Sequence, residues 1–262
     1  MLVQTDQYPK EAVELNPYLS DHEIEEQQRD LVREVFDRTQ LETIHAVWMG
    51  PRSRYSNLVR TLETRQFPEM PDVMDGYEDD CKFLALLDTR SGIERVVHAF
   101  RLSVPTIDRA QGLQIALLDD LVKSNQKLTE DELQEFYAAQ GIALNSEAAS
   151  VESNFRVGDK VETDNGLRVS DLGYIAIFQH IAENGGAKVI FAHLNDAAVN
   201  SLGAIGVQDA PIAGVENLST PTVIDGQAGF DEKYHPVAIM NTPQNLAVFA
   251  QLTPFAAPEV QL

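Results

Sequence analysis

Three ionisable residues stand in stretches that are otherwise rich in apolar residues: Glu152 in residues 148–157, Arg101 in residues 94–104 and His193 in residues 187–194. Burial raises the pKa of a carboxyl group toward neutrality, where the group can accept a proton during a reaction. Glu152 is therefore a candidate general base, and His193 is a second one. A structural ion pair is the competing interpretation for Glu152, and a core histidine is the competing one for His193 and for His98. Arg101 is costly to bury without a carboxylate partner.

Charge is distributed unevenly between residues 50 and 80. The first part is a basic island that contains one acidic residue, Glu63, and the basic residues Arg52, Arg54, Arg60 and Arg65. The second part has no basic residue and contains Glu69, Asp72, Asp75, Glu78, Asp79 and Asp80. A basic island on an acidic protein indicates a site for phosphates or for an acidic partner protein. A structural ion-pair network between the two parts is the alternative.

Composition narrows the class of protein. The chain has 262 residues, 44% of them hydrophobic, which is enough for a full core and favours one domain with appendages. The net charge of −21 disfavours nucleic acid and anionic membranes as partners. No apolar run approaches the ~18 residues of a membrane span, and the polar start is unlike a signal peptide, so we expect a cytoplasmic protein. The single cysteine, Cys81, excludes a Cys-rich metal site, and no metal is expected.

The clearest secondary structure lies in residues 170–207. The pattern predicts a helix over 172–184 with Ser170 as its N-cap, a buried strand over 187–194, and a helix over 196–204 capped by Asn195. Helix, strand and helix in this order predict strands covered by helices.

Other elements follow from local signals. Capping boxes at Ser20 and Thr129 predict helices that end near Gln40 and Gln140. Residues 82–88 and 94–104 form a predicted hairpin, and 44–49 fit either a strand or a buried helix. Further helices are expected over 55–65 and 111–124, a loop over 158–169, and further strands over 148–157, 235–241 and 246–251. The predicted organisation is a helical extension over 1–45 and one domain over 46–262.

This order of elements resembles the GCN5-related N-acetyltransferase fold, and residues 195–206 (NDAAVNSLGAIG) are similar to its closing motif. The resemblance implies an α+β fold (an α/β/α sandwich) with a helical insertion and a mixed sheet that splays between its fourth and fifth strands. The pantetheine arm of an acyl carrier would lie between the Glu152 strand and the strand over 187–194. The glycine-rich phosphate signature of coenzyme A-using members is absent, and residues 168–173 (RVSDLG) are its nearest approximation.

A narrower resemblance rests on four segments: DGYE at 75–78, FLA at 83–85, FRLSVPT at 100–106 and ESNFRV at 152–157. Together they resemble the acyl-homoserine-lactone synthases and the related N-acyl amino acid synthases. The resemblance implies that Arg101 pairs with Asp75, Glu78 or Glu152 and shapes the acceptor pocket. A purely structural ion pair is the alternative for Arg101. The other substrate-binding positions that it implies are Phe83, Phe155, Arg156 and Asn195. Glu78 replaces an aspartate of the family pattern, and Phe155-Arg156 inverts its Arg-Phe order.

The activity that the resemblance implies is transfer of a fatty acyl group from acyl carrier protein, in preference to acyl-coenzyme A, to the amine of S-adenosylmethionine or an amino acid. The product would be an acyl-homoserine lactone autoinducer for quorum sensing, or an N-acyl amino acid. No tightly bound cofactor is expected, and Arg52, Arg54 and Arg60 would dock the carrier protein. The alternatives are a non-catalytic ligand sensor, favoured by the departures from the family pattern, and a coenzyme A-dependent N-acetyltransferase.

Overall fold

The computed structural model describes residues 18–66, 81–103, 117–118, 122, 129–156, 167–184, 186–212, 220–221 and 233–262. The chain forms two compact units. The first contains Met1–Arg101, Ser153–His180 and Thr253–Leu262, and the second contains Leu102–Glu152 and Ile181–Leu252.

In the first unit the strands are β1 (Ile44–Met49), β2 (Cys81–Asp88), β3 (Arg95–Ser103, up to Arg101 in this unit) and β9 (Glu259–Gln261). Their order is β9-β1-β2-β3. β1 pairs antiparallel with β2 and parallel with β9. The apolar run over 44–49 is therefore a strand, and the predicted hairpin is confirmed as neighbouring β2 and β3, with Gly92 in its turn at a φ of 85°. β9 is too short to carry a periodic sequence signal.

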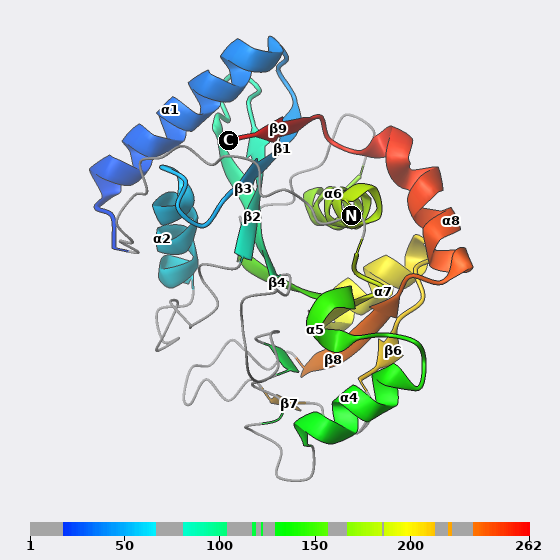
Figure 1. Ribbon diagram of the computed structural model, residues 1–262. Helices are drawn as coiled ribbons and strands as arrows, with labels where there is room; N and C mark the ends of the chain where they lie inside the picture. The colour runs from blue at the N-terminus through cyan, green and yellow to red at the C-terminus, as the bar shows by residue number, and fades with distance from the viewer. Residues whose placement is uncertain are drawn as a thin grey trace. The chain divides into compact units, whose positions relative to one another are not determined.

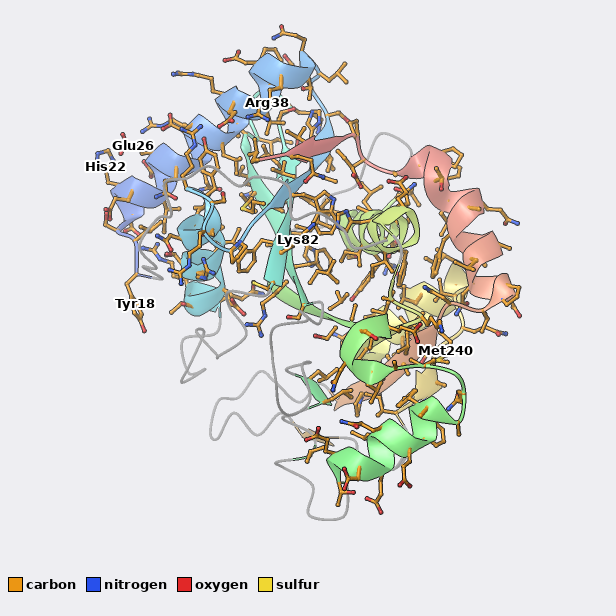
Figure 2. All side chains as sticks on the ribbon, viewed as in Figure 1. Tyr18, His22, Glu26, Arg38, Lys82 and Met240 are labelled. Atoms are coloured by element: carbon orange, nitrogen blue, oxygen red, sulfur yellow. The ribbon has the colours of Figure 1, made fainter. Side chains whose placement is uncertain are left out.

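Helices cover both faces of this first sheet (Figure 1). On one face α1 (Asp21–Thr39) and α2 (Ser56–Gln66) pack against alternate strand residues, and the shared core includes Leu31, Leu58, Val47, Phe83 and Ala85. The predicted capping box at Ser20 is confirmed, and Gln40 ends α1 in the left-handed conformation. Figure 2 shows His22 and Glu26 projecting from the outer side of α1, where both are exposed.

The other face of the first sheet is covered by α6 (Val169–Asn184, up to His180 in this unit). The Trp48 ring of β1 stacks on His180, and the Phe100 ring of β3 contacts Tyr174 edge to face. The prediction that Ser170 caps this helix is wrong. The helix begins at Val169, and the Arg168 carbonyl accepts the first helical hydrogen bonds from Asp171 N and Leu172 N at 3.0 and 3.2 Å.

The second unit contains Ala148–Glu152 of β4 (Ala148–Arg156), together with β5 (Val189–Asn195) and β8 (Lys233–Met240), in the order β4-β5-β8-β6. β5 is parallel to β4 and antiparallel to β8. The short strands β6 (Ala210–Pro211) and β7 (Thr220–Pro221) both pair with β8. The predicted strands over 148–157, 187–194 and 235–241 are thereby confirmed.

The second unit also contains the helices α4 (Glu130–Ala138), α5 (Leu144–Glu147), α7 (Asp196–Ala204) and α8 (Pro243–Leu252). The predicted capping box at Thr129 is confirmed. α4 packs its Tyr137 ring edge to face on Phe191 of β5, with ring centroids 5.3 Å apart.

The prediction of a strand over 246–251 is wrong, because this segment belongs to α8. Thr242 begins the helix: its Oγ1 accepts from Asn245 N at 3.2 Å, and its carbonyl accepts from Leu246 N at 2.9 Å. Pro243 follows at the first helical position, which favours proline. The buried Asn245 side chain then binds both the N–H and the carbonyl of Gln208 and the carbonyl of Met240.

The predicted fold class is confirmed: in the described residues each unit contains part of a mixed β-sheet, with parallel and antiparallel pairs, and helices lie against the strands. The expected boundary between residues 45 and 46 falls inside β1. The expected loop over 158–169 and the helix over 111–124 lie outside the described residues for most of their length. No helix in the described segments is long and apolar enough to cross a membrane.

Candidate active site

The parallel pairing of β4 with β5 marks the candidate site. The register runs from Ala148↔Val189 to Val151↔Ala192, four partner pairs. Both strands continue beyond the last pair, β4 to Arg156 and β5 to Asn195. The first positions after the pairing are those of Glu152 and His193, the two predicted bases. The structure therefore places their backbones at the point where the described pairing of the two strands stops.

Asn195 ends β5 and begins α7. Its backbone is extended (φ −76°, ψ 168°), and its side-chain oxygen accepts a hydrogen bond from Ala198 N at 2.8 Å. The predicted N-cap is confirmed, and Gly206, with a φ of 91°, follows the end of the helix. α7 thus directs its N-terminal N–H groups toward the same end of β5 that carries His193.

Arg101 and Phe83 are buried in the first unit. Arg101 lies on β3 and is 7% exposed, so its guanidinium needs the polar partners that a buried charge requires. Phe83 is fully buried among the side chains of α1 and α2, and the Arg60 guanidinium lies over its ring at 4.7 Å from the centroid. The substrate-binding role of Phe83 stays a prediction.

Several predicted site residues fall outside what the structure describes. Asp75 and Glu78 lie in the segment 67–80, outside the described residues. Phe155 and Arg156 are placed on β4 by their backbone only. Their roles remain predictions.

The basic island does not present Arg60 to a partner. Arg60 is fully buried, and its Nη2 donates to the Pro51 carbonyl at 3.1 Å. The prediction that Arg60 docks a carrier protein is therefore wrong, because a buried guanidinium that stacks on Phe83 cannot meet a protein surface. Local charge clustering shows which residues are basic but not which side of the helix they occupy.

Arg54 is exposed but is already engaged in a cluster that joins α1 to the segment after β1. It forms an ion pair with Glu34 and lies over the Tyr55 ring at 4.6 Å. The Tyr55 hydroxyl donates to Glu34 at 3.0 Å, and Arg38 binds the other oxygen of Glu34 at 2.5 Å. Burial opposes ionisation of Glu34, yet the bonds from Arg54 and Tyr55 outweigh it and hold the pKa of Glu34 below its usual value. Burial, reinforced by Glu34, raises the pKa of Tyr55.

Two histidines lie among aromatic rings on the α6 face of the first unit. His98 is 3% exposed and stacks on Phe100 with ring centroids 4.2 Å apart, which confirms its predicted place in the core. His180 stacks on Trp48. Burial lowers the pKa of His180 to about 4, and the positive charge of Lys82 adds to the effect. No local sequence pattern indicates the Trp48–His180 pair, since its members are far apart in the chain.

A hydrogen-bonded pair of an aspartate and a histidine lies in the second unit. His235 Nε2 is 2.6 Å from Asp196 Oδ1, which joins β8 to the first turn of α7. Asp196 follows the predicted cap at Asn195, but the sequence did not indicate that His235 would reach it. No group of three or more candidate metal ligands occurs in the part of the chain that the structure describes.

A scan against protein-family models found no match, and a search among curated proteins found none either. Among solved structures, the chain is similar to BjaI, a CoA-dependent acyl-homoserine lactone synthase, in its structure with SAM and isopentyl-CoA. The TM-score is 0.51 and the identity 15%, over 84% of this chain and 93% of that chain. For the structure of BjaI with MTA the TM-score is 0.49 and the identity 15%, over 84% of this chain and 93% of that chain. For MesI, another CoA-dependent acyl-homoserine lactone synthase, the TM-score is 0.46 and the identity 12%, over 82% of this chain and 99% of that chain.

At these identities the likeness concerns the fold alone. It is carried by the structure of BjaI with SAM and isopentyl-CoA, which spans most of both chains. The resemblance to the GCN5-related N-acetyltransferase fold, in the form that the acyl-homoserine-lactone synthases have, is therefore confirmed at the level of architecture.

Proposed function

We propose that this protein is an acyltransferase that moves a fatty acyl group from a phosphopantetheine thioester to the amine of a small acceptor. The acceptor is S-adenosylmethionine or an amino acid, and the product is an acyl-homoserine lactone or an N-acyl amino acid. We place this activity in the cytoplasm, where both kinds of substrate occur.

The observation that carries the proposal is the end of the described β4–β5 register at Val151↔Ala192. Backbone N–H and C=O groups of a strand that leaves its neighbour need other partners. The amide groups of a pantetheine arm are suitable partners, because they can extend the hydrogen bonding of a strand edge. A thioester held there would meet the chain at Glu152 and at the N-terminal end of α7.

Transfer from a thioester to an amine requires that the acceptor ammonium lose a proton before its nitrogen attacks. We assign this step to Glu152, with His193 as the alternative base one strand away. Arg101, with Asp75 and Glu78, is proposed to shape the acceptor pocket. Phe83, Phe155, Arg156 and Asn195 complete the proposed contacts with the substrates.

The donor is acyl carrier protein or acyl-coenzyme A. The missing glycine-rich phosphate signature favours carrier protein, but with Arg60 buried the proposed docking surface reduces to Arg52 and Arg54. A net charge of −21 also repels an acidic carrier protein at long range. BjaI, by contrast, is described as CoA-dependent. Both donors therefore belong in the test, with charge reversal at Arg52 and Arg54 as the probe of carrier-protein docking.

The experiment is incubation of the full chain with acyl carrier protein or coenzyme A thioesters of several chain lengths. Each donor is offered S-adenosylmethionine or mixed amino acids, and acylated products are read by mass spectrometry. We expect an acylated product, and we expect Glu152→Gln to fold normally and lose turnover by about 100-fold or more. A folded, fully active Glu152→Gln variant would remove Glu152 from the mechanism.

Absence of any acylated product from the unmodified protein, across all donors and acceptors, would overturn the acyltransferase proposal. Binding of S-adenosylmethionine or an acyl thioester without turnover, measured by calorimetry, would then support the ligand-sensor alternative. The replacement of an aspartate by Glu78 and the inverted Phe155-Arg156 order are the features that favour that alternative.

A further inference from the structure

The Asp196–His235 pair occupies a definite place in the second unit. Its two atoms, His235 Nε2 and Asp196 Oδ1, are 2.6 Å apart, and the side chains are 38% and 73% exposed. A carboxylate only accepts hydrogen bonds, so Nε2 carries the proton in this contact. The bond fixes the imidazole ring and leaves Nδ1 on the opposite edge of the ring.

The strand register puts this pair at the same end of β5 as the candidate base. On one side of β5, Glu152 follows directly after the last β4–β5 pair, Val151↔Ala192. On the other side, His235 of β8 lies opposite Leu194, two positions farther along β5 than Ala192. Paired strands lie about 4.8 Å apart, so His235 is one strand width from β5, while Glu152 is the first β4 residue after the last β4–β5 pair.

α7 completes the arrangement from the end of the strand. Asn195 caps the helix, and Asp196 is its first residue. The carboxylate that orients His235 is therefore held by a capped helix, and the histidine is held by a strand that pairs along the whole of β5. The pair joins two rigid elements, in contrast to a contact between two loops.

Acyl transfer moves two protons, and the proposed function accounts for only one of them. An acceptor ammonium carries three hydrogens, and the amide product keeps one. The first proton leaves before attack and goes to the base. As the C–N bond forms and the C–S bond breaks, the second proton leaves the nitrogen, and the departing thiolate needs a proton to become a thiol.

We propose that His235, oriented by Asp196, is the general acid that protonates the departing pantetheine thiolate. This inference rests on the proposed acyltransferase function. Protonated at Nδ1, the imidazole gives that proton to the thiolate sulfur and is later reprotonated with the proton released from the attacking nitrogen. Atoms and charges balance: acyl thioester and ammonium give amide, thiol and one proton, which Glu152 releases to solvent.

Histidine is suited to this step because it gains and loses protons near neutral pH. The ionisable groups on the elements that pack around His235 are few in the described residues. They are Asp196 of α7, His193 of β5, Asp209 ahead of β6, and Lys233 and Tyr234 of β8 itself. Of these, Asp196 is the one that the structure shows bonded to the ring.

The test uses two acyl donors with the same octanoyl chain. One is the pantetheine thioester, whose alkyl thiolate needs a proton in order to leave. The other is the thioester of thionitrobenzoate, whose aryl thiolate leaves unprotonated at neutral pH. For His235→Gln we expect kcat/KM to fall about 100-fold with the pantetheine donor and by less than about 5-fold with the aryl donor. Glu152→Gln should lose activity with both donors, because the ammonium must be deprotonated in either case.

Two variants control the result. His22→Gln removes an exposed histidine of α1 and should match the unmodified protein with both donors. Asp196→Asn keeps the imidazole but weakens its orientation, so it should show a smaller loss with the same donor dependence. Should His235→Gln fail to fold in a thermal melt, Asp196→Asn carries the same comparison.

The outcomes separate the two proposals. An inactive unmodified protein overturns the acyltransferase function and this inference with it. An active protein in which His235→Gln loses equally with both donors, or loses nothing, overturns the acid role of His235 and leaves the acyltransferase function standing. A loss confined to the pantetheine donor supports it.

Discussion

Trp48 of β1 and His180 of α6 stack on each other, with ring centroids 4.2 Å apart and ring planes inclined by 26°. Trp48 is the single tryptophan of the chain, so its fluorescence reports on the first unit alone. The stack also holds a histidine that burial keeps neutral, with a pKa of about 4.

The first prediction concerns acid stability. An unfolded histidine has a pKa near 6.5, whereas His180 has a pKa of about 4 in the folded protein. Between these values the unfolded state binds the additional proton, so stability is greatest above pH 6.5 and falls as the pH drops toward 4. The loss should reach about 3 kcal/mol. Urea unfolding followed by Trp48 fluorescence at several pH values measures it.

His180→Phe keeps a ring against Trp48 and cannot be protonated, so this variant should lose less stability between pH 7 and pH 4 than the unmodified protein. His22→Gln, on the exposed side of α1, should follow the unmodified protein. An unchanged pH dependence in His180→Phe would contradict the assignment.

The second prediction compares two helical glycines. A methyl group at Gly173 of α6 would collide with the Phe100 ring, whereas one at Gly203 of α7 meets nothing within 4 Å. We expect Gly173→Ala to lower the free energy of unfolding by about 2 kcal/mol and Gly203→Ala to raise it by about 0.5 kcal/mol. Denaturant unfolding of both variants checks the difference. Phe100→Leu in the Gly173→Ala background should recover part of the loss, and absence of any recovery would argue against the collision.

The third prediction separates buried from exposed arginines. Arg60→Ala removes a guanidinium that is fully buried over Phe83 and leaves the Pro51 carbonyl without its donor, so it should cost about 3 kcal/mol. Arg54→Ala removes an ion pair whose arginine is 63% exposed, and it should cost less than about 1 kcal/mol. Equal costs in urea unfolding would mean that Arg60 is not held as the structure shows.

The fourth prediction isolates the capping role of Asn195. Asn195→Ala removes the acceptor for Ala198 N and should cost about 1 kcal/mol, whereas Asn195→Ser should retain most of the cap. Asn200→Ala, on the exposed side of the same helix, is the matched control and should cost nothing. Hydrogen exchange of the first amides of α7 reads the cap directly. A substrate role for Asn195 would show as a raised KM in Asn195→Ser despite an intact helix.

Elements with local hydrogen-bond signals were predictable from the sequence. The boxes at Ser20 and Thr129 and the cap at Asn195 form as expected, because each bond joins residues three positions apart. The prediction for Ser170 is wrong because α6 already begins at Val169, so Ser170 lies inside the helix. The segment over 246–251 resembles a strand in sequence because its run of apolar residues is too short to show a helical period. The sequence feature that indicates a helix there is Thr242-Pro243, a capping threonine followed by a proline at the first helical position.

Contacts between residues far apart in the chain could not be predicted from local sequence patterns. The burial of Arg60 depends on β2 supplying Phe83, and the Asp196–His235 bond depends on the β5–β8 register. Neither contact leaves a local pattern, because its members are far apart in the chain. The placement of Glu152 and His193 beside the end of the β4–β5 register followed from the family resemblance together with the strand boundaries.

β9 has a consequence for how the chain is made. It pairs with β1 through Ala46↔Glu259 and Trp48↔Gln261, and Leu262 N donates to the Trp48 carbonyl at 2.8 Å. The ribosome releases β1 early and β9 only after every strand of the second unit. Until then the outer edge of β1 has open N–H and C=O groups, which can pair with other nascent chains. A chain that lacks residues 259–261 therefore leaves β1 with an unpaired edge that can aggregate, and β9 prevents this by pairing with it.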